Sequence, residues 1–135
     1  SLSQSPSVVW DELRHIDRHV NWMMDAKNIE FQSAQREGIG TSFICTTKVG
    51  PFTLLDAMTI TTWIDKAVIG VQHHGLVGGR GVFTLSPCGT GTLLVWRETL
   101  RFPWWMGGPV GALIAAPVLR AIWRKNLAAF ATTLP

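Results

Sequence analysis

The fold is decided by a stretch near the end of the chain, residues 119–134, which reads LRAIWRKNLAAFATTL. Its apolar side chains recur at steps of three and four residues, the spacing that places them on one face of an α-helix. Arg120, Arg124 and Lys125 lie off that face. The stretch therefore predicts an amphipathic C-terminal helix that packs against the rest of the protein. The members of the apolar face are Leu119, Ile122, Trp123, Leu127, Phe130 and Leu134, with the polar Asn126 among them.

The segment before this helix, residues 102–119, carries no charge, which raises the question of a membrane-spanning helix. Pro103, Pro109 and Pro117 interrupt it, together with three glycines, and proline breaks or kinks a helix interior. We therefore expect a loop followed by a buried helix. Small side chains such as Ala115 continue the helical face upstream, and small residues where a helix meets a sheet leave room for a cavity.

The middle of the chain predicts strands. From about Asn28 the apolar pattern changes to a period of two, and short turns rich in Gly, Pro and Asp follow at intervals, which is typical of an antiparallel meander. The glycine-rich residues 78–81 are interpreted as a hairpin turn. Upstream, Ser5-Pro6-Ser7 opens a first helix, and a second short helix is expected over residues 16–22. The six expected strands cover residues 28–33, 41–49, 52–64, 67–74, 80–86 and 92–102.

Composition narrows the class of protein. A length of 135 residues, 47% hydrophobic and 16% charged, predicts one globular domain over residues 1–135. The net charge of +3 is scattered, and no basic stripe or reading element is visible, so a nucleic-acid partner is not expected. Cys45 and Cys88 lack metal-site or disulfide spacing, which favours free thiols in a reducing cytoplasm.

The order of elements and several local motifs resemble the START-like (SRPBCC) superfamily, in its polyketide cyclase/dehydrase-like branch. Residues 5–10, SPSVVW, are similar to the family's pattern of Pro, a spacer and Val-Trp, and Trp22 falls where a Trp ends its second helix. Residues 83–87 and 91–96 resemble its strand–loop–strand hairpin. The resemblance implies an α+β helix-grip fold: a curved antiparallel β-sheet wrapped around a long C-terminal helix, with two short helices after the first strand. Only residues 1–4 are left for that first strand, so it is either short or begins upstream.

The resemblance also implies a pocket between sheet and helix for a hydrophobic molecule such as a lipid, a polyketide or an aromatic-like compound. No cofactor or metal is expected. Some members of the superfamily are cyclases, dehydratases or hydrolases, and many only bind or carry, so the fold does not decide the chemistry. A binder and a cyclase/dehydratase-type enzyme both stay open, and so does the oligomeric state.

Strand alternation nominates two inward-facing carboxyl groups. Glu98 is in step with Trp96 and Leu100, and Asp56 is in step with Leu54 and Met58. A carboxyl group held among apolar side chains can act as a general acid or base on a bound carbonyl compound. In the alternative interpretation, bulges break the alternation and both groups face water or pair with arginine.

Four histidines accompany these acids. His73 and His74 are consecutive on one strand, so only one of them can enter the cavity, and the parity of their neighbours does not choose between them. Either one is a proton donor or a hydrogen-bonded surface residue. His15 and His19 lie four apart on a possible helix, but no metal motif accompanies them, and we expect both to be solvated.

The expected cavity wall comes from both the strands and the helix, with plain core packing as the alternative. Asn126 is a special case, because a buried amide needs either a backbone partner or a polar group of the ligand. The wall and ligand-contact candidates are Met58, Phe83, Leu85, Trp96, Ala115, Leu119, Trp123 and Asn126.

Trp104 and Trp105 stand in the loop that joins the last strand to the helix. A Trp-rich loop with glycines beside it can act as a lid at the cavity mouth, touch a membrane interface transiently, or fold back over the core. Trp104 and Trp105 are therefore further candidates for contact with the ligand.

Overall fold

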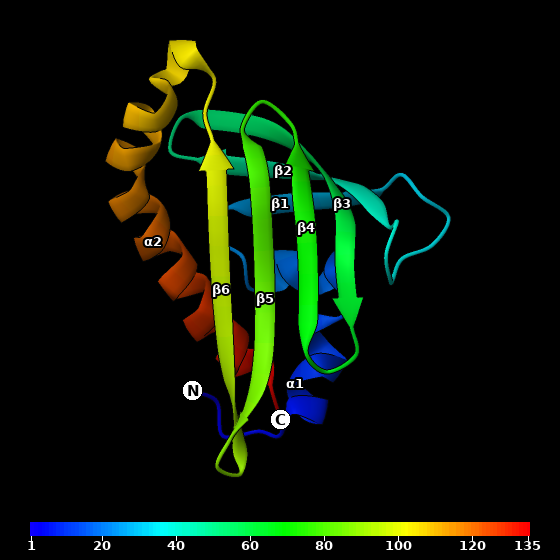
Figure 1. Cartoon of the computed structure of the whole chain (residues 1–135). Coiled ribbons are helices and arrows are strands. Elements are labelled where there is room, and N and C mark those ends of the chain that lie inside the picture. Colours follow the sequence, from blue (N-terminus) through cyan, green and yellow to red (C-terminus); the bar gives the residue numbers. More distant parts are fainter.

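The computed structural model describes all residues, 1–135, and its centre is one antiparallel sheet with strands in chain order, each paired with the next (Figure 1). The predicted meander is confirmed, and each expected strand is present with ends shifted by a few residues. The strands are β1 (Ala26–Phe31), β2 (Ser42–Val49), β3 (Phe52–Ile64), β4 (Val68–His74), β5 (Gly78–Cys88) and β6 (Gly91–Arg101).

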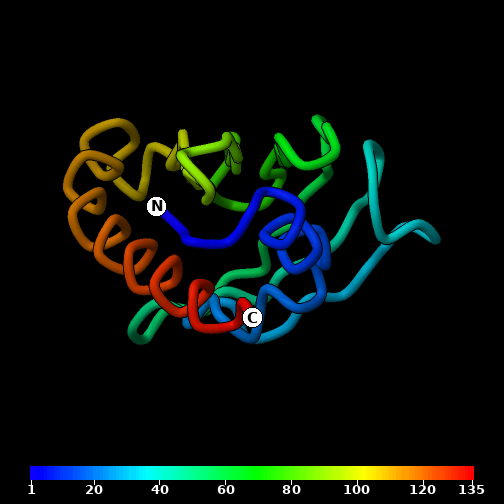
Figure 2. Tube along the Cα trace, turned by 90° about the horizontal axis from the view of Figure 1, so that it is seen from below, coloured from blue at the N-terminus to red at the C-terminus, as the bar shows by residue number.

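Four helical segments surround this sheet: α1 (Pro6–Leu13), η1 (Ile16–Asn21), η2 (Trp104–Met106) and α2 (Gly108–Thr133). The second predicted helix, η1, is a 3₁₀-helix. The long α2 runs beside β6 (Figure 1), and a view from below shows the sheet and α2 arranged around a common interior, with α1 at the near end (Figure 2). The protein therefore has the α+β helix-grip architecture.

Helix α2 begins at Gly108, so the helical face continues upstream through Ala115 as predicted, and the expected loop is confined to the residues before Gly108. Pro109 sits in the first turn, where its missing N–H would be unpaired in any case. Pro117 lies inside the helix but on its exposed side, where water can hydrogen-bond the carbonyl group that loses its partner. The upstream half, however, is not buried as expected: Leu113 and Ile114 are largely exposed. None of the helices combines the length and apolar character that crossing a bilayer requires.

The expected first strand is reduced to a single bridge between Leu2 and Thr92 at the edge of β6. The Leu2 N–H donates to the Thr92 carbonyl oxygen (2.8 Å), and the Thr92 N–H donates to the Leu2 carbonyl oxygen (2.9 Å). A Cβ at Gly91 would collide with the Leu2 carbonyl group, so a glycine is needed for the chains to approach. Two short helices therefore follow a bridge, not a full strand.

The dry core fills only one end of the interior, where α1, η1 and the last turns of α2 meet the sheet. Leu13, Ile60 and Phe130 have no exposed surface. The Trp22 ring packs edge-on against Phe130, with centroids 5.1 Å apart, and against Phe83 at 6.1 Å. This aromatic cluster closes the lower end, and the space between the sheet and the upstream half of α2 is left open.

Candidate functional site

A cavity of about 370 Å³ lies between the concave face of the sheet and α2. This volume is within the range of small-molecule sites, and 23 of its 29 lining residues are hydrophobic. Six predicted wall residues line it: Met58, Phe83, Trp96, Ala115, Leu119 and Trp123. The small Ala115 faces the open space, as the helix pattern indicated.

Two other predicted wall residues are not part of the cavity. Leu85 faces the same side of the sheet as Phe83, but it lies one step further toward the closed end and is buried in the core. Asn126 is fully buried and already has protein partners. Its Oδ1 accepts from the Met24 N–H (2.9 Å), and its Nδ2 donates to Asp25 Oδ1 (2.8 Å). The amide therefore ties α2 to the start of β1 and has no role left for a ligand.

The tryptophan pair in η2 also lies outside the cavity. Trp104 is 87% exposed and Trp105 is 59% exposed, and the cavity lining includes neither. The structure therefore does not bring these two rings into the cavity lining, and the alternative in which this loop folds back over the core is wrong. The neighbouring Met106 and Phe102 line the cavity instead.

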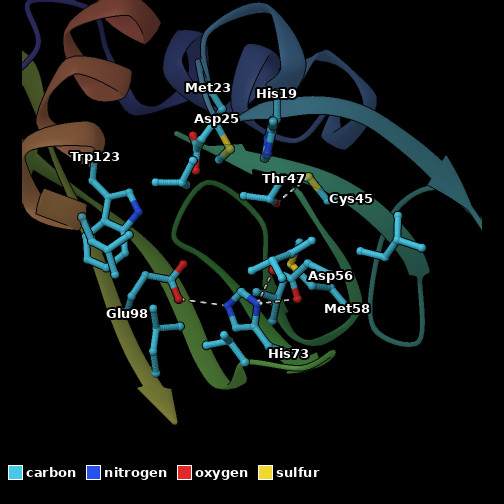
Figure 3. A pocket seen from close by; sticks show the side chains of 18 of the residues that line it. His19, Met23, Asp25, Cys45, Thr47, Asp56, Met58, His73, Glu98 and Trp123 are labelled. Carbon is cyan, nitrogen blue, oxygen red and sulfur yellow. Dashed lines mark hydrogen bonds and ion pairs between the residues drawn. The ribbon is translucent and has the colours of Figure 1, made fainter. Parts of the chain in front are cut away.

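The most prominent polar feature of the cavity is a line of three side chains, Asp56, His73 and Glu98 (Figure 3). The His73 imidazole lies between the two carboxyl groups: its Nδ1 is 2.9 Å from Asp56 Oδ2, and its Nε2 is 2.9 Å from Glu98 Oε2. The Trp96 indole N–H donates to the other Glu98 oxygen, Oε1, at 2.9 Å. Both carboxyl groups thus face inward, as strand alternation predicted, and pairing with arginine is ruled out.

His73 is a cation at neutral pH because of these two partners. Burial by itself lowers the pKa of the imidazole, but the hydrogen bonds and charges of Asp56 and Glu98 outweigh it and raise the pKa of His73 to about 10. Both ring nitrogens therefore carry hydrogen, and each N–H donates to one carboxylate. His74 points the other way: it is exposed, and its Nε2 lies 3.2 Å from the Thr59 hydroxyl oxygen. The structure thus excludes His74 from the site.

Glycines in β5 allow this line of residues to form. His73 on β4 and Glu98 on β6 are not on adjacent strands, because β5 runs between them and places Gly79 opposite His73 and Gly81 opposite Glu98. A Cβ at Gly81 would collide with the Glu98 carboxylate. The glycine-rich residues 78–81 are therefore strand residues that clear the path across β5, and the interpretation as a hairpin turn is corrected.

A second histidine lines the cavity at the opposite end (Figure 3). His19 is only 5% exposed, and its Nε2 lies 2.8 Å from the Leu13 carbonyl oxygen. Burial lowers the pKa of His19 to about 4, so the ring is neutral and donates one N–H to that oxygen. The expectation that His19 is solvated is wrong, since η1 folds under the sheet and carries the ring inside.

Comparison with solved structures places this architecture among known folds. The Zhui aromatase/cyclase from Streptomyces sp. R1128 superposes with a TM-score of 0.74 at 14% identity, over 98% of this chain and 87% of that one. The di-domain ARO/CYC StfQ from the steffimycin biosynthetic pathway gives 0.78 at 14% identity, over 97% of this chain and 47% of that one. Ara h 8.0201 gives 0.73 at 11% identity, over 98% and 91%.

The chain shares the helix-grip fold with these proteins. No family model matches the chain, and a comparison with curated proteins finds no relative by sequence. At identities this low, the likeness establishes the fold and leaves the chemistry of the cavity to its own residues.

Four residues that line the cavity were not predicted as site residues: the polar His19, Asp25 and Thr47, and the thiol-bearing Cys45. Cys45 and Thr47 are in step with Phe43 on β2, so the alternation argument that found Asp56 also applies to them. Burial raises the pKa of the Cys45 thiol to about 11, which keeps it protonated and a poor nucleophile. No comparable sequence signal indicated Asp25, which precedes β1.

Proposed function

We propose that residues 1–135 form a binding domain for a small hydrophobic molecule, held in the cavity between the sheet and α2. The observation that supports this proposal is the hollow of about 370 Å³ with a mostly hydrophobic lining. Protein interiors are normally packed without voids of this size, so an apolar hollow favours an occupant. The two cysteines are free thiols, which is compatible with the cytoplasmic setting expected from the sequence.

The ligand has a defined route to the cavity. Phe52 and Leu55, in the first part of β3, and Leu76, in the turn between β4 and β5, line the cavity and are also exposed, so they form its rim. An apolar rim gives a hydrophobic molecule a continuous surface from solvent to interior.

Filling the cavity is the direct test. Ala115→Phe places a ring in the hollow, whereas Ala121→Phe puts the same ring on the exposed side of the same helix. We expect an uncharged fluorescent naphthyl dye to bind the parent and Ala121→Phe, and Ala115→Phe to bind it at least about tenfold more weakly. Circular dichroism and thermal melting establish that both variants are folded. Equal binding by all three proteins would contradict the proposal.

A second candidate function is acid–base catalysis of the cyclase/dehydratase type, favoured by the contact of Asp56, His73 and Glu98 at one cavity wall. In a dehydration, a carboxylate oxygen accepts a proton from a carbon next to a carbonyl group, and those electrons form the new double bond. The neighbouring C–O bond breaks, and the leaving hydroxide departs as water with a proton that the His73 imidazolium passes on through the other carboxylate. The protonated carboxyl group then returns its proton to His73.

A β-hydroxyketone that carries a naphthyl group tests this candidate. We expect the parent to catalyse loss of one water, followed by mass spectrometry, and His73→Gln to lose the acceleration by at least about 100-fold. His74→Gln serves as the matched control, because His74 lies outside the cavity. If the probe binds but the parent does not dehydrate it faster than buffer, the domain is a binder.

A third candidate is transient membrane contact through the exposed Trp104 and Trp105, which lie next to the cavity-lining Met106. Tryptophan side chains favour the membrane interface. Co-sedimentation of the parent with liposomes, lost in the Trp104→Ala/Trp105→Ala variant, would support it, and equal sedimentation would remove it.

A further inference from the structure

The charges that line the cavity are unbalanced. Three acidic side chains face it, Asp25, Asp56 and Glu98, and no lysine or arginine does. His73 is the only cation among the lining residues and neutralises one of them, since the other lining histidine, His19, is uncharged at neutral pH. The cavity therefore carries an excess of negative charge within apolar walls, where charges act strongly.

Apart from the neutral Trp123 indole N–H (Figure 3) and the weak Cys45 S–H donor, the side-chain hydrogen-bond donors of the cavity already have partners within the protein. Both N–H groups of His73 and the N–H of Trp96 already bond to the two carboxylates. His19 donates to a backbone oxygen, and the Thr47 hydroxyl group faces the Cys45 sulfur at 3.7 Å. The carboxylate oxygens, by contrast, have lone pairs left, and the Asp56 side chain is the more accessible of the pair, 23% exposed against 8% for Glu98.

Aromatic rings stand beside these acceptors. Trp96 and Trp123 both line the cavity, with ring centroids 5.7 Å apart, and Trp96 holds Glu98 directly. The apolar body of a cation that binds the carboxylates can therefore pack against these two indole rings. A carboxylate ligand at the same place would meet like charge without a free cationic partner.

From these observations we propose that the cavity selects hydrophobic amines: the protonated amine donates to Asp56 and Glu98, and the apolar body lies against Trp96 and Trp123. This inference rests on the proposed ligand-binding function and adds the charge class of the ligand to it. Carboxylic acids of the same shape, fatty acids included, are the molecules that the site rejects.

The test compares ligands that differ only in their head group: dodecylamine, dodecanol and dodecanoate, and separately 2-(1-naphthyl)ethylamine, 2-(1-naphthyl)ethanol and 1-naphthylacetate. Affinities are measured by titration calorimetry or tryptophan fluorescence at pH 6, where the amines are charged and His73 holds its proton. We expect the amine to bind at least about tenfold more tightly than the alcohol in each series, since a hydrogen bond between charged groups is stronger than one between neutral groups. The acid is expected to bind most weakly.

The outcomes separate the two proposals. If the alcohol binds as well as the amine, or the acid binds most tightly, the charge preference is overturned while ligand binding stands. If no member of either series binds, both proposals fail. If the amine preference is present, it must depend on the carboxylates and not on the net charge of the protein.

Asp56→Asn tests that dependence, with Asp65→Asn as its control, because Asp65 is an exposed acid in the turn between β3 and β4. Both substitutions remove one negative charge. We expect the amine-to-alcohol affinity ratio to fall about tenfold in Asp56→Asn and to stay unchanged in Asp65→Asn. Thermal melting verifies that each variant folds. Equal ratios in the two variants would overturn the inference.

Discussion

Two buried histidines line the same cavity and differ in charge. His19, at the end closed by the aromatic cluster, has one backbone oxygen as its partner, and its pKa is lowered to about 4. His73, at the other end, lies between Asp56 and Glu98, and its pKa is raised to about 10. Burial disfavours the charged ring in both cases. The partners of a buried histidine, more than its burial, therefore decide its charge, and the cavity has a neutral end at His19 and an ionic end at His73.

Removing the ring at the ionic end should have the largest effect on stability. In His73→Leu, Asp56 and Glu98 lose the cation between them and are left as uncompensated charges, so we expect the free energy of unfolding in urea to fall by about 3–5 kcal/mol. The same substitution at the exposed His74 should change it by less than about 0.5 kcal/mol. The triple variant Asp56→Asn/His73→Leu/Glu98→Gln should regain much of the loss. Similar losses in the two single variants would contradict the ionic description.

The charge of His73 also predicts how the free energy of unfolding changes as the pH rises above 6.5. The folded pKa of His73, about 10, lies above its unfolded value near 6.5, so the native state holds an extra proton between these values. The stabilisation is complete below pH 6.5 and is lost as the pH rises toward 10. We expect up to about 3 kcal/mol of loss between pH 6.5 and 9 in the parent, relative to His73→Gln. Parallel profiles for parent and variant would refute this prediction.

His19, at the neutral end, should instead lower the free energy of unfolding as the pH falls below 6.5. The folded pKa of His19, about 4, lies below its unfolded value, so the unfolded chain binds the extra proton. Stability from His19 is therefore complete above pH 6.5 and is lost as the pH falls toward 4. Between pH 6.5 and 5 we expect about 2 kcal/mol of loss in the parent relative to His19→Gln, which keeps an N–H donor but does not titrate. A larger loss of unfolding free energy in His19→Gln than in the parent over this pH range would contradict a neutral, buried His19.

The smallest expected effect concerns the amide that joins α2 to the neutral end. Asn126→Ala leaves the Met24 N–H and the Asp25 carboxylate without their partner, and we expect a loss of about 1–2 kcal/mol in unfolding free energy. Because the amide has no ligand contact, probe affinity should stay within about twofold of the parent. A strong loss of affinity with unchanged stability would return Asn126 to the ligand-binding residues.

Much of the fold could be predicted because each signal was local. Period-two alternation and regular turns found all six strands, and the same alternation pointed Asp56 and Glu98 inward. Alternation could not choose between His73 and His74, since both have apolar neighbours of the same parity. The choice comes from the pairing of β4 with β3 and β5, which the sequence does not show.

The errors arose where a distant partner decides the outcome. Asn126 is satisfied by residues about a hundred positions away, and a buried amide in a sequence gives no sign of such partners. Leu85 faces the interior side of the sheet, as the alternation predicted, but it lies too far along β5 to reach the cavity. Helix α1 covers that end of the sheet. Gly79 and Gly81 looked like a turn, and their role becomes visible only when His73 and Glu98 are seen on either side of β5.

The central claim, a cavity with one neutral and one cationic histidine, is tested most directly by NMR of ¹⁵N-labelled imidazoles during a pH titration. We predict that His73 keeps both ring protons up to about pH 10, and that His19 stays a neutral tautomer down to about pH 4. Titration of both rings near pH 6.5 would contradict the claim.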